Sequence, residues 1–143
     1  LRAGILGAQV VHLRWLGTPP KLHTGTESNA APFVLHPRVK KTEISAADPD
    51  PTKKGIRTAK VELEPAVGKA QRVVLFLNEL AATAPRAFSA VALRRENDTD
   101  PVEFHLFGVD PGMEFLVRVQ VDGAESPLEL KDGAYAGPKV TAP

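Results

Sequence analysis

Two segments of the chain alternate apolar and polar side chains residue by residue. In residues 57–64, Ala59, Val61 and Leu63 lie on one side of an extended chain and charged residues lie on the other. Residues 115–121 repeat the pattern, with Phe and Val on one side and Arg and Gln on the other. Because side chains of a β-strand point alternately to its two faces, both segments are predicted to be strands with one face against a core.

Further apolar runs, separated by turn residues, predict a protein made of short strands. Residues 71–78 are apolar on both faces, which indicates an interior strand of a sheet. The remaining predicted strands are residues 39–44, 87–93, 102–106 and a last one from about residue 128, with a break at Asp132-Gly133. Residues 46–55 are polar and predict a loop. Seven strands after residue 38, at this spacing, predict an all-β fold, an antiparallel immunoglobulin-like β-sandwich.

A helix over residues 74–87 is the alternative for one part of this pattern. The Leu, Asn, Glu and Ala residues of VLFLNELAATAPRA permit a helix. The β-branched pair Val73-Val74 and the later Pro85 disfavour it, so we expect a strand here. A helical turn at residues 79–83 remains open.

The alternation also predicts which side chains form the core. The predicted core residues are Val61, Leu63, Val73, Leu75, Leu77, Phe104, Leu106, Phe115, Val117, Val119 and Val121. Directly after them, Asp122-Gly123 is the signature of a type I′ turn, in which both central residues need positive φ. We expect this turn to join the last two long strands of the domain.

The first 37 residues do not fit the same domain. Residues 8–16 and 31–35 are predicted strands, residues 17–29 a turn-rich loop, and Pro37 ends the second strand. Two strands cannot bury a face alone. We therefore expect residues 1–37 to be the last strands of a preceding sandwich, whose upstream part covers them, and residues 38–143 to be the immunoglobulin-like domain. The chain opens without Met, and we expect it to be a piece of a longer polypeptide.

One face of the first strand is strongly apolar. Val11, Leu13 and Trp15 share this face, and Val10, His12 and Arg14 share the other. Trp15 is the single Trp of the chain. A Trp on a strand can form a platform on which a sugar stacks, but core or inter-domain packing is the more common role and the one we expect.

Composition and charge exclude several classes of function. The net charge is +1 with both signs mixed along the chain, which offers no basic footprint for nucleic acid or an anionic membrane. No apolar run approaches the roughly 18 residues of a transmembrane helix. The chain has no Cys, so it forms no disulfide and no thiolate metal site, and its fold depends on packing alone.

Candidate catalytic and metal-binding residues do not form a recognisable pattern. The four histidines are His12, His23, His36 and His105, and none has a second ligand at metal-binding spacing. Residues 97–100, Asn-Asp-Thr-Asp, are compared with a calcium loop, but a solvated turn explains them better. The serines are Ser28, Ser45, Ser89 and Ser126, and none lies in a nucleophile elbow. Asp48, Asp50, Glu62 and Glu64 have the spacing of exposed charges. We expect no catalytic, cofactor-binding or metal-binding residue, no cofactor and no enzyme activity.

Three segments of the chain resemble one bacterial family. They are QRVVLFLNEL (residues 71–80), FLVRVQVDGAESPLEL (115–130) and GPKVTAP (137–143). They are similar to the C-terminal immunoglobulin-like region of the tube-cap, or tail-terminator, proteins of extracellular contractile injection systems, which are phage-tail-like particles. Residues 6–39 are similar to the last strands of the IPT/TIG-like sandwich that precedes this region. The resemblance covers nearly the whole chain, and VRVQVDGAESPL is its most specific part.

The resemblance implies a structural role for the chain. In the family a separate N-terminal domain closes the end of the tube and sheath as a six-fold ring, and this chain would be the appended part. The implied partners are its own upstream domains and the tube and sheath components, with a homo-oligomeric ring in the full-length protein. The implied location is cytoplasmic assembly and release as part of a particle. No catalytic or binding residue carries over.

Two other functions suit the same fold. Tandem immunoglobulin-like domains occur in bacterial surface adhesins and in carbohydrate-binding modules, and such a domain can also be a non-catalytic appendage of a secreted hydrolase. A fold alone does not choose among these functions.

Overall fold

The computed structural model describes residues 1–50, 52, 55–81, 83–99 and 101–143. These described residues form β-strands and no α-helix. The strands before residue 38 are β1 (Gly4–Ala8), β2 (Val11–Leu16), β3 (Lys21–Glu27) and β4 (Ala31–Leu35). The strands after it are β5 (Arg38–Ile44), β6 (Arg57–Glu64), β7 (Val73–Glu79), β8 (Ala87–Val91), β9 (Val102–Leu106), β10 (Glu114–Val121), β11 (Ala124–Glu125), β12 (Glu129–Lys131), β13 (Ala134–Gly137) and β14 (Lys139–Thr141).

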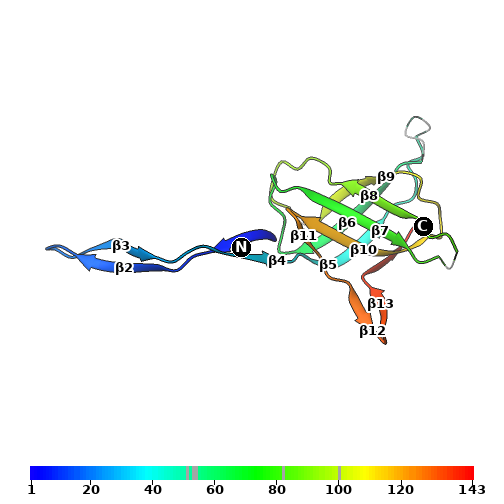
Figure 1. Ribbon diagram of the computed structural model, residues 1–143. Helices are drawn as coiled ribbons and strands as arrows, with labels where there is room; N and C mark the ends of the chain where they lie inside the picture. Colours follow the sequence, from blue (N-terminus) through cyan, green and yellow to red (C-terminus); the bar gives the residue numbers. More distant parts are fainter. Residues whose placement is uncertain (51, 53–54, 82, 100) are drawn as a thin grey trace.

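Two antiparallel sheets pack face to face and form the body of the molecule (Figure 1). One sheet has the order β5-β6-β9, and the other has the order β11-β10-β7-β8, with β14 also paired to β10. Strand β7 lies between β10 and β8, which confirms the interior strand predicted from its two apolar faces. The body is an immunoglobulin-like β-sandwich, as the sequence predicted.

The core lies between these sheets and includes every side chain that the alternation selects, together with others such as Val67, Val102 and Val140. All eleven predicted core residues are at most 2% exposed. In β6 the inward positions are fully buried, and the alternating positions are exposed or half-buried. Phe88 adds an edge-to-face contact with Phe115, with ring centroids 5.6 Å apart. Burying one such side chain stabilises the fold by about 1.5–3 kcal/mol, so the stability of the sandwich depends on these inward positions.

The strand predicted over residues 71–78 runs from Val73 to Glu79, so the alternative helix over 74–87 is wrong for this part of the segment. Seven backbone pairings with β10 hold these residues in a sheet, and they outweigh the helical tendency of the Leu and Glu residues. The helical turn left open at residues 79–83 includes residue 82, which lies outside the described residues.

The turn at Asp122-Gly123 has the predicted geometry. Asp122 has φ 44° and Gly123 has φ 88°, as a type I′ turn requires. The prediction that this turn joins two long strands is wrong, however, because β11, the strand that follows it, has only two residues. Ser126 still donates its backbone N–H to Val119, and Pro127 then ends the ladder because it has no N–H to donate.

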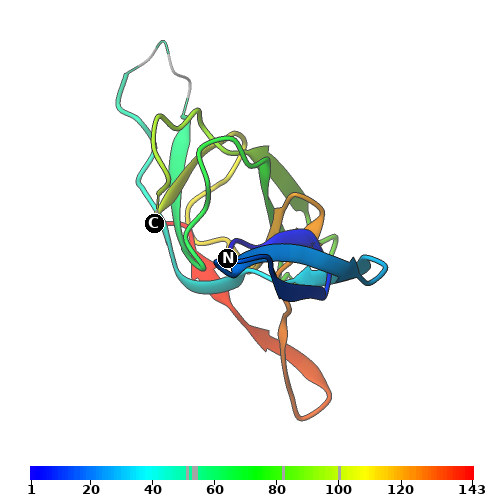
Figure 2. The same cartoon turned by 90° about the vertical axis from the view of Figure 1, so that its left-hand side faces the viewer.

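A second hairpin replaces the single last strand that the sequence predicted. Asp132 and Gly133, taken as a break, have φ 51° and 79° and form a turn between β12 and β13. Figures 1 and 2 show this hairpin projecting from the sandwich. The chain then returns as β14 to pair with β10. The local pattern did not reveal this, because a strand with a break and two short strands around a turn have the same alternation.

Residues 4–35 form a long two-stranded ribbon, which we call the arm. Strand β1 pairs with β4, and β2 pairs with β3 farther out. The prediction that residues 17–29 are a loop is therefore wrong, because β3 occupies most of them. The Pro- and Gly-rich turn is confined to residues 17–20, and the Leu and Thr residues of β3 suit a strand once β2 lies beside them. Residues 8–16, predicted as one strand, are divided between β1 and β2.

Candidate protein interaction surface

The arm extends away from the sandwich instead of packing on it (Figure 1). Viewed along its length in Figure 2, it is a narrow ribbon. Every residue of β2 and β3 is exposed. An isolated two-stranded ribbon is only marginally stable in water, so this exposure makes the arm the first candidate for contact with a partner.

One face of the outer half of the arm is apolar, and we call it the tip face: Val11, Leu13, Trp15 and Leu22. The register pairs Trp15 with Leu22 and Leu13 with Thr24, which places these side chains on the same side of the ribbon. Their exposed fractions are 41% for Val11, 53% for Leu13, 69% for Trp15 and 50% for Leu22. The alternation predicts the shared face of Val11, Leu13 and Trp15. Leu22 is not part of that prediction, because residues 17–29 are predicted to be a loop.

A β-bulge in β3 keeps the tip face continuous. The register shifts between Val11 and Leu13, where β3 has one more residue than β2. A Cβ on Gly25 would lie only 2.7 Å from the carbonyl oxygen of His12, so this position accepts only glycine without a local shift. The bulge thus accommodates the extra residue in β3, and the side chains of β2 keep their alternation between the two faces of the ribbon.

The base of the arm is joined to the sandwich by a hydrogen-bond network, which we call the junction. The carboxylate of Asp122 accepts one hydrogen bond from the backbone N–H of Arg72 at 2.8 Å and one from Nε2 of Gln71 at 2.9 Å. The same Nε2 donates to the carbonyl oxygen of Ala3 at 2.8 Å, and Ala3 is buried. A turn of the sandwich therefore fixes the residue that precedes β1.

The second strand of the arm is held at its base as well. Nδ1 of His36 lies 2.7 Å from the carbonyl oxygen of Glu125. The Glu125 carboxylate pairs with Arg118 at 2.5 Å, and Arg118 also donates to Asn78 at 3.0 Å. Because both strands are tied to the sandwich, the direction of the arm is set by the fold. The sequence carried no signal for these contacts, which join residues up to 89 positions apart.

A small hollow lies next to the base of the arm, and we call it the root hollow. Its volume is about 220 Å³, and its eight lining residues are His36, Pro37, Arg38, Val39, Pro127, Leu128, Glu129 and Pro138. Five of these are apolar, three of them prolines. The lining joins the end of the arm to the segment that leads into the β12–β13 hairpin, where Leu130 and Tyr135 are also exposed.

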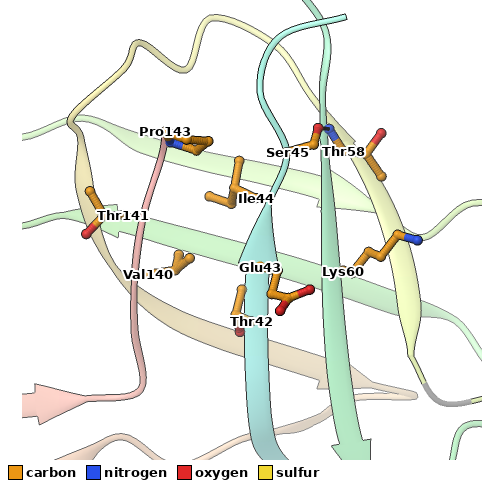
Figure 3. A pocket seen from close by; sticks show the side chains of 9 residues that line it. All are labelled: Thr42, Glu43, Ile44, Ser45, Thr58, Lys60, Val140, Thr141 and Pro143. Carbon is orange, nitrogen blue, oxygen red and sulfur yellow. Dashed lines mark hydrogen bonds between the residues drawn. The ribbon is translucent and has the colours of Figure 1, made fainter.

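A larger groove, about 570 Å³ in volume, lies between β5 and β14 (Figure 3). The side chains of Thr42, Ile44 and Val140 lie between the two strands, whereas Lys60 extends to the far side of β6. Glu43 is hydrogen-bonded to Lys41 at 2.6 Å, and this bond, together with the charge of Lys41, lowers the pKa of Glu43. Lys41 thus holds Glu43, the one side-chain carboxylate among the described residues that line the groove, in its ionised form.

The residues considered as catalytic or metal-binding candidates are dispersed over the fold. The described residues contain no group of three His, Asp or Glu that could hold a metal ion. His12 and His23 lie on the arm, His36 at its base, and His105 on β9. The segment 97–100, predicted to be a solvated turn rather than a calcium loop, includes residue 100, which lies outside the described residues. Asp98 within it pairs with Arg2.

The other candidate residues have structural contacts. The Ser126 hydroxyl accepts a hydrogen bond from the backbone of Val119, and the Ser45 hydroxyl accepts one from Thr58. Asp48 and Asp50 accept backbone N–H groups within their own loop. No helix of the described part of the chain is long and apolar enough to cross a membrane.

Trp15 is not a core residue of this chain, so that part of its predicted role is wrong. It lies on the outer half of the arm, where no second sheet of the described residues faces β2 and every residue of β2 is exposed. Packing against another domain or protein stays a prediction.

Together, these features define an immunoglobulin-like β-sandwich protein with a fixed, projecting β-arm. Residues 37–141 match the family described as a domain of unknown function, DUF8756, and the chain belongs to this family. The arm lies outside the matched region. No curated protein and no solved structure matches the chain.

Proposed function

We propose that this chain is a non-catalytic structural module that binds another protein through its arm. The observation that carries the proposal is the tip face, an apolar surface on a ribbon whose direction the junction sets. Proteins rarely leave a contiguous apolar surface of this kind in water unless it is an interaction site. A fixed direction also lowers the entropy lost on binding, since the arm is ordered beforehand.

The chemistry of the tip face favours a protein partner. Trp15 is flanked by Leu13 and Leu22, which offer dispersion and apolar burial but no hydrogen bond. Aromatic residues surrounded by aliphatic ones are typical of the centre of protein interfaces. A large aromatic side chain can bury about 150–250 Å² of surface, so burial of Trp15 alone would form a substantial part of an interface.

The biological setting that we propose is the one implied by the resemblance. The chain would be the C-terminal accessory module of a cap protein that ends the tube and sheath of a contractile injection particle. Its partners would be its own upstream domains and tube or sheath components, in a full-length protein that forms a ring. Assembly would take place in the cytoplasm, with release as part of the particle. The support is the similarity of residues 71–80, 115–130 and 137–143.

The test is assembly of the particle. The full-length protein is produced together with the tube and sheath proteins, and particles are separated on a density gradient. We expect the double variant Trp15→Ser, Leu22→Ser to be depleted from the particle fraction. The control Arg14→Ser, His23→Ser changes the opposite face of the same ribbon and should leave incorporation unchanged. Equal incorporation of both variants would contradict a binding role of the arm, and absence of the unaltered protein from particles would contradict the setting.

A carbohydrate-binding module is the second candidate, because Trp15 is exposed on a flat ribbon. Sugar recognition needs hydrogen-bond donors and acceptors around the stacking ring. Affinity electrophoresis in gels containing bacterial or plant polysaccharides tests it directly. Retardation that disappears in Trp15→Ser, but persists in Arg14→Ser, would favour this candidate over the first.

A further inference from the structure

We propose that the partner of the tip face is a second copy of this chain, with the two arms packed antiparallel and Trp15 of each lying in the root hollow of the other. This inference rests on the proposed role of the arm as the interaction surface. It adds the identity of the partner and the site that receives Trp15.

Trp15 cannot reach the root hollow of its own chain. Strand β4 ends at Leu35, and Trp15 is paired with Leu22, thirteen residues farther along the ribbon. At about 3.3 Å per residue the two ends lie roughly 40 Å apart. The junction and the His36 contact hold the base of the arm, so the ribbon does not fold back. A Trp15 side chain in this hollow must come from another molecule.

Antiparallel packing brings the two complementary ends of the arm together. Because the two arms run in opposite directions, the tip of one arm lies at the root of the other. Two-fold symmetry makes this contact occur twice in the pair. The root offers apolar cross-strand pairs on both of its faces, Ile5 with Val34 on one and Leu6 with Phe33 on the other. Whichever face the twist of the ribbon presents, the partner's tip face meets apolar side chains.

The buried area separates this arrangement from tip-on-tip packing. The exposed fractions of the tip face and of Ile5 and Val34 correspond to roughly 600 Å² per copy and ~1,200 Å² for the pair, the lower bound of specific interfaces. Tip-on-tip packing would bury roughly 400 Å² per copy, below that bound, and would leave the root hollow without an occupant. The area therefore favours the antiparallel pair.

The test uses cysteine cross-linking, for which the chain is suited because it has no Cys of its own. Chains with Thr24→Cys, which lies on the tip-face side of the ribbon and leaves Trp15 in place, are mixed with differently tagged chains that carry Glu129→Cys at the root hollow, and the mixture is oxidised. We expect a mixed cross-linked dimer and little cross-linking of Thr24→Cys with itself. Ser89→Cys on the exposed edge of β8 is the control for random collision. Mixed dimers no more abundant than this control, or dominant Thr24→Cys self-linking, would overturn the arrangement.

Sedimentation equilibrium of the chain provides the second measurement, over about 1–100 µM. The unaltered chain should form dimers, Trp15→Ala should weaken them at least tenfold, and the matched Arg14→Ala should leave them unchanged. A chain that stays monomeric over the whole range would overturn the second-copy partner. If the particle test still shows dependence on the tip face, the proposed function stands and only this inference fails.

Discussion

Replacing Asp122 with Ala tests whether the sandwich fixes the direction of the arm. Asp122 accepts hydrogen bonds from Arg72 and Gln71, and Gln71 in turn holds Ala3. The substitution removes both acceptors, so we expect a loss of global stability together with release of the base of β1.

The magnitude follows from three contributions. Each hydrogen bond to a charged acceptor contributes about 1.5–3 kcal/mol when sheltered, and both bonds at Asp122 are solvent-exposed, which places them at or below the low end of that range. The φ of 44° adds about 1 kcal/mol of strain for Ala, because Asp tolerates this region better. The sum is about 2–4 kcal/mol, a large part of the 5–15 kcal/mol typical of a domain.

The matched variant is Asp122→Asn, which keeps the tolerance for positive φ and one acceptor for Arg72. We expect it to lose about 1 kcal/mol, the contribution of a single hydrogen bond. Urea unfolding measures the global loss, and amide hydrogen exchange of β1 measures release of the arm. If Asp122→Ala unfolds at the same urea concentration as the unaltered chain and β1 keeps its protection, the junction does not hold the arm.

Three further predictions concern the core, the arm and metal ions. Val119→Asp should abolish the cooperative thermal transition, because an unpaired buried charge costs several kcal/mol at a fully buried site; a normal melting curve would show the core assignment to be wrong. Gly25→Val should disrupt the β2–β3 ladder at the bulge and raise exchange there, with the melting temperature of the sandwich unchanged; protected amides in both strands would refute the close approach to His12. Zinc, calcium or a chelator should leave the melting temperature of the chain unchanged, and a reproducible shift on adding either metal would contradict us.

The strands and the core of the sandwich were accessible from the sequence because both depend on short-range regularities. An inward side chain recurs every second residue of a strand. Val61 and Val119 are therefore predicted to be core residues, because the residues beside them are charged or polar. The turn at Asp122-Gly123 was accessible for a similar reason, since positive φ at two adjacent residues restricts residue choice locally. The resemblance also rests on such local strings.

The site depended on contacts that no local pattern encodes. The sequence placed Val11, Leu13 and Trp15 on one face, but the same alternation is compatible with burial in a core or with exposure on an arm. Only the tertiary structure showed that, in the part of the chain it describes, no second sheet covers them, that β3 lies beside β2, and that Gln71 and Asp122 hold the base of the ribbon. Strand pairing and hydrogen bonds between residues far apart in the chain decide these features, whereas side-chain alternation records only which way each residue points.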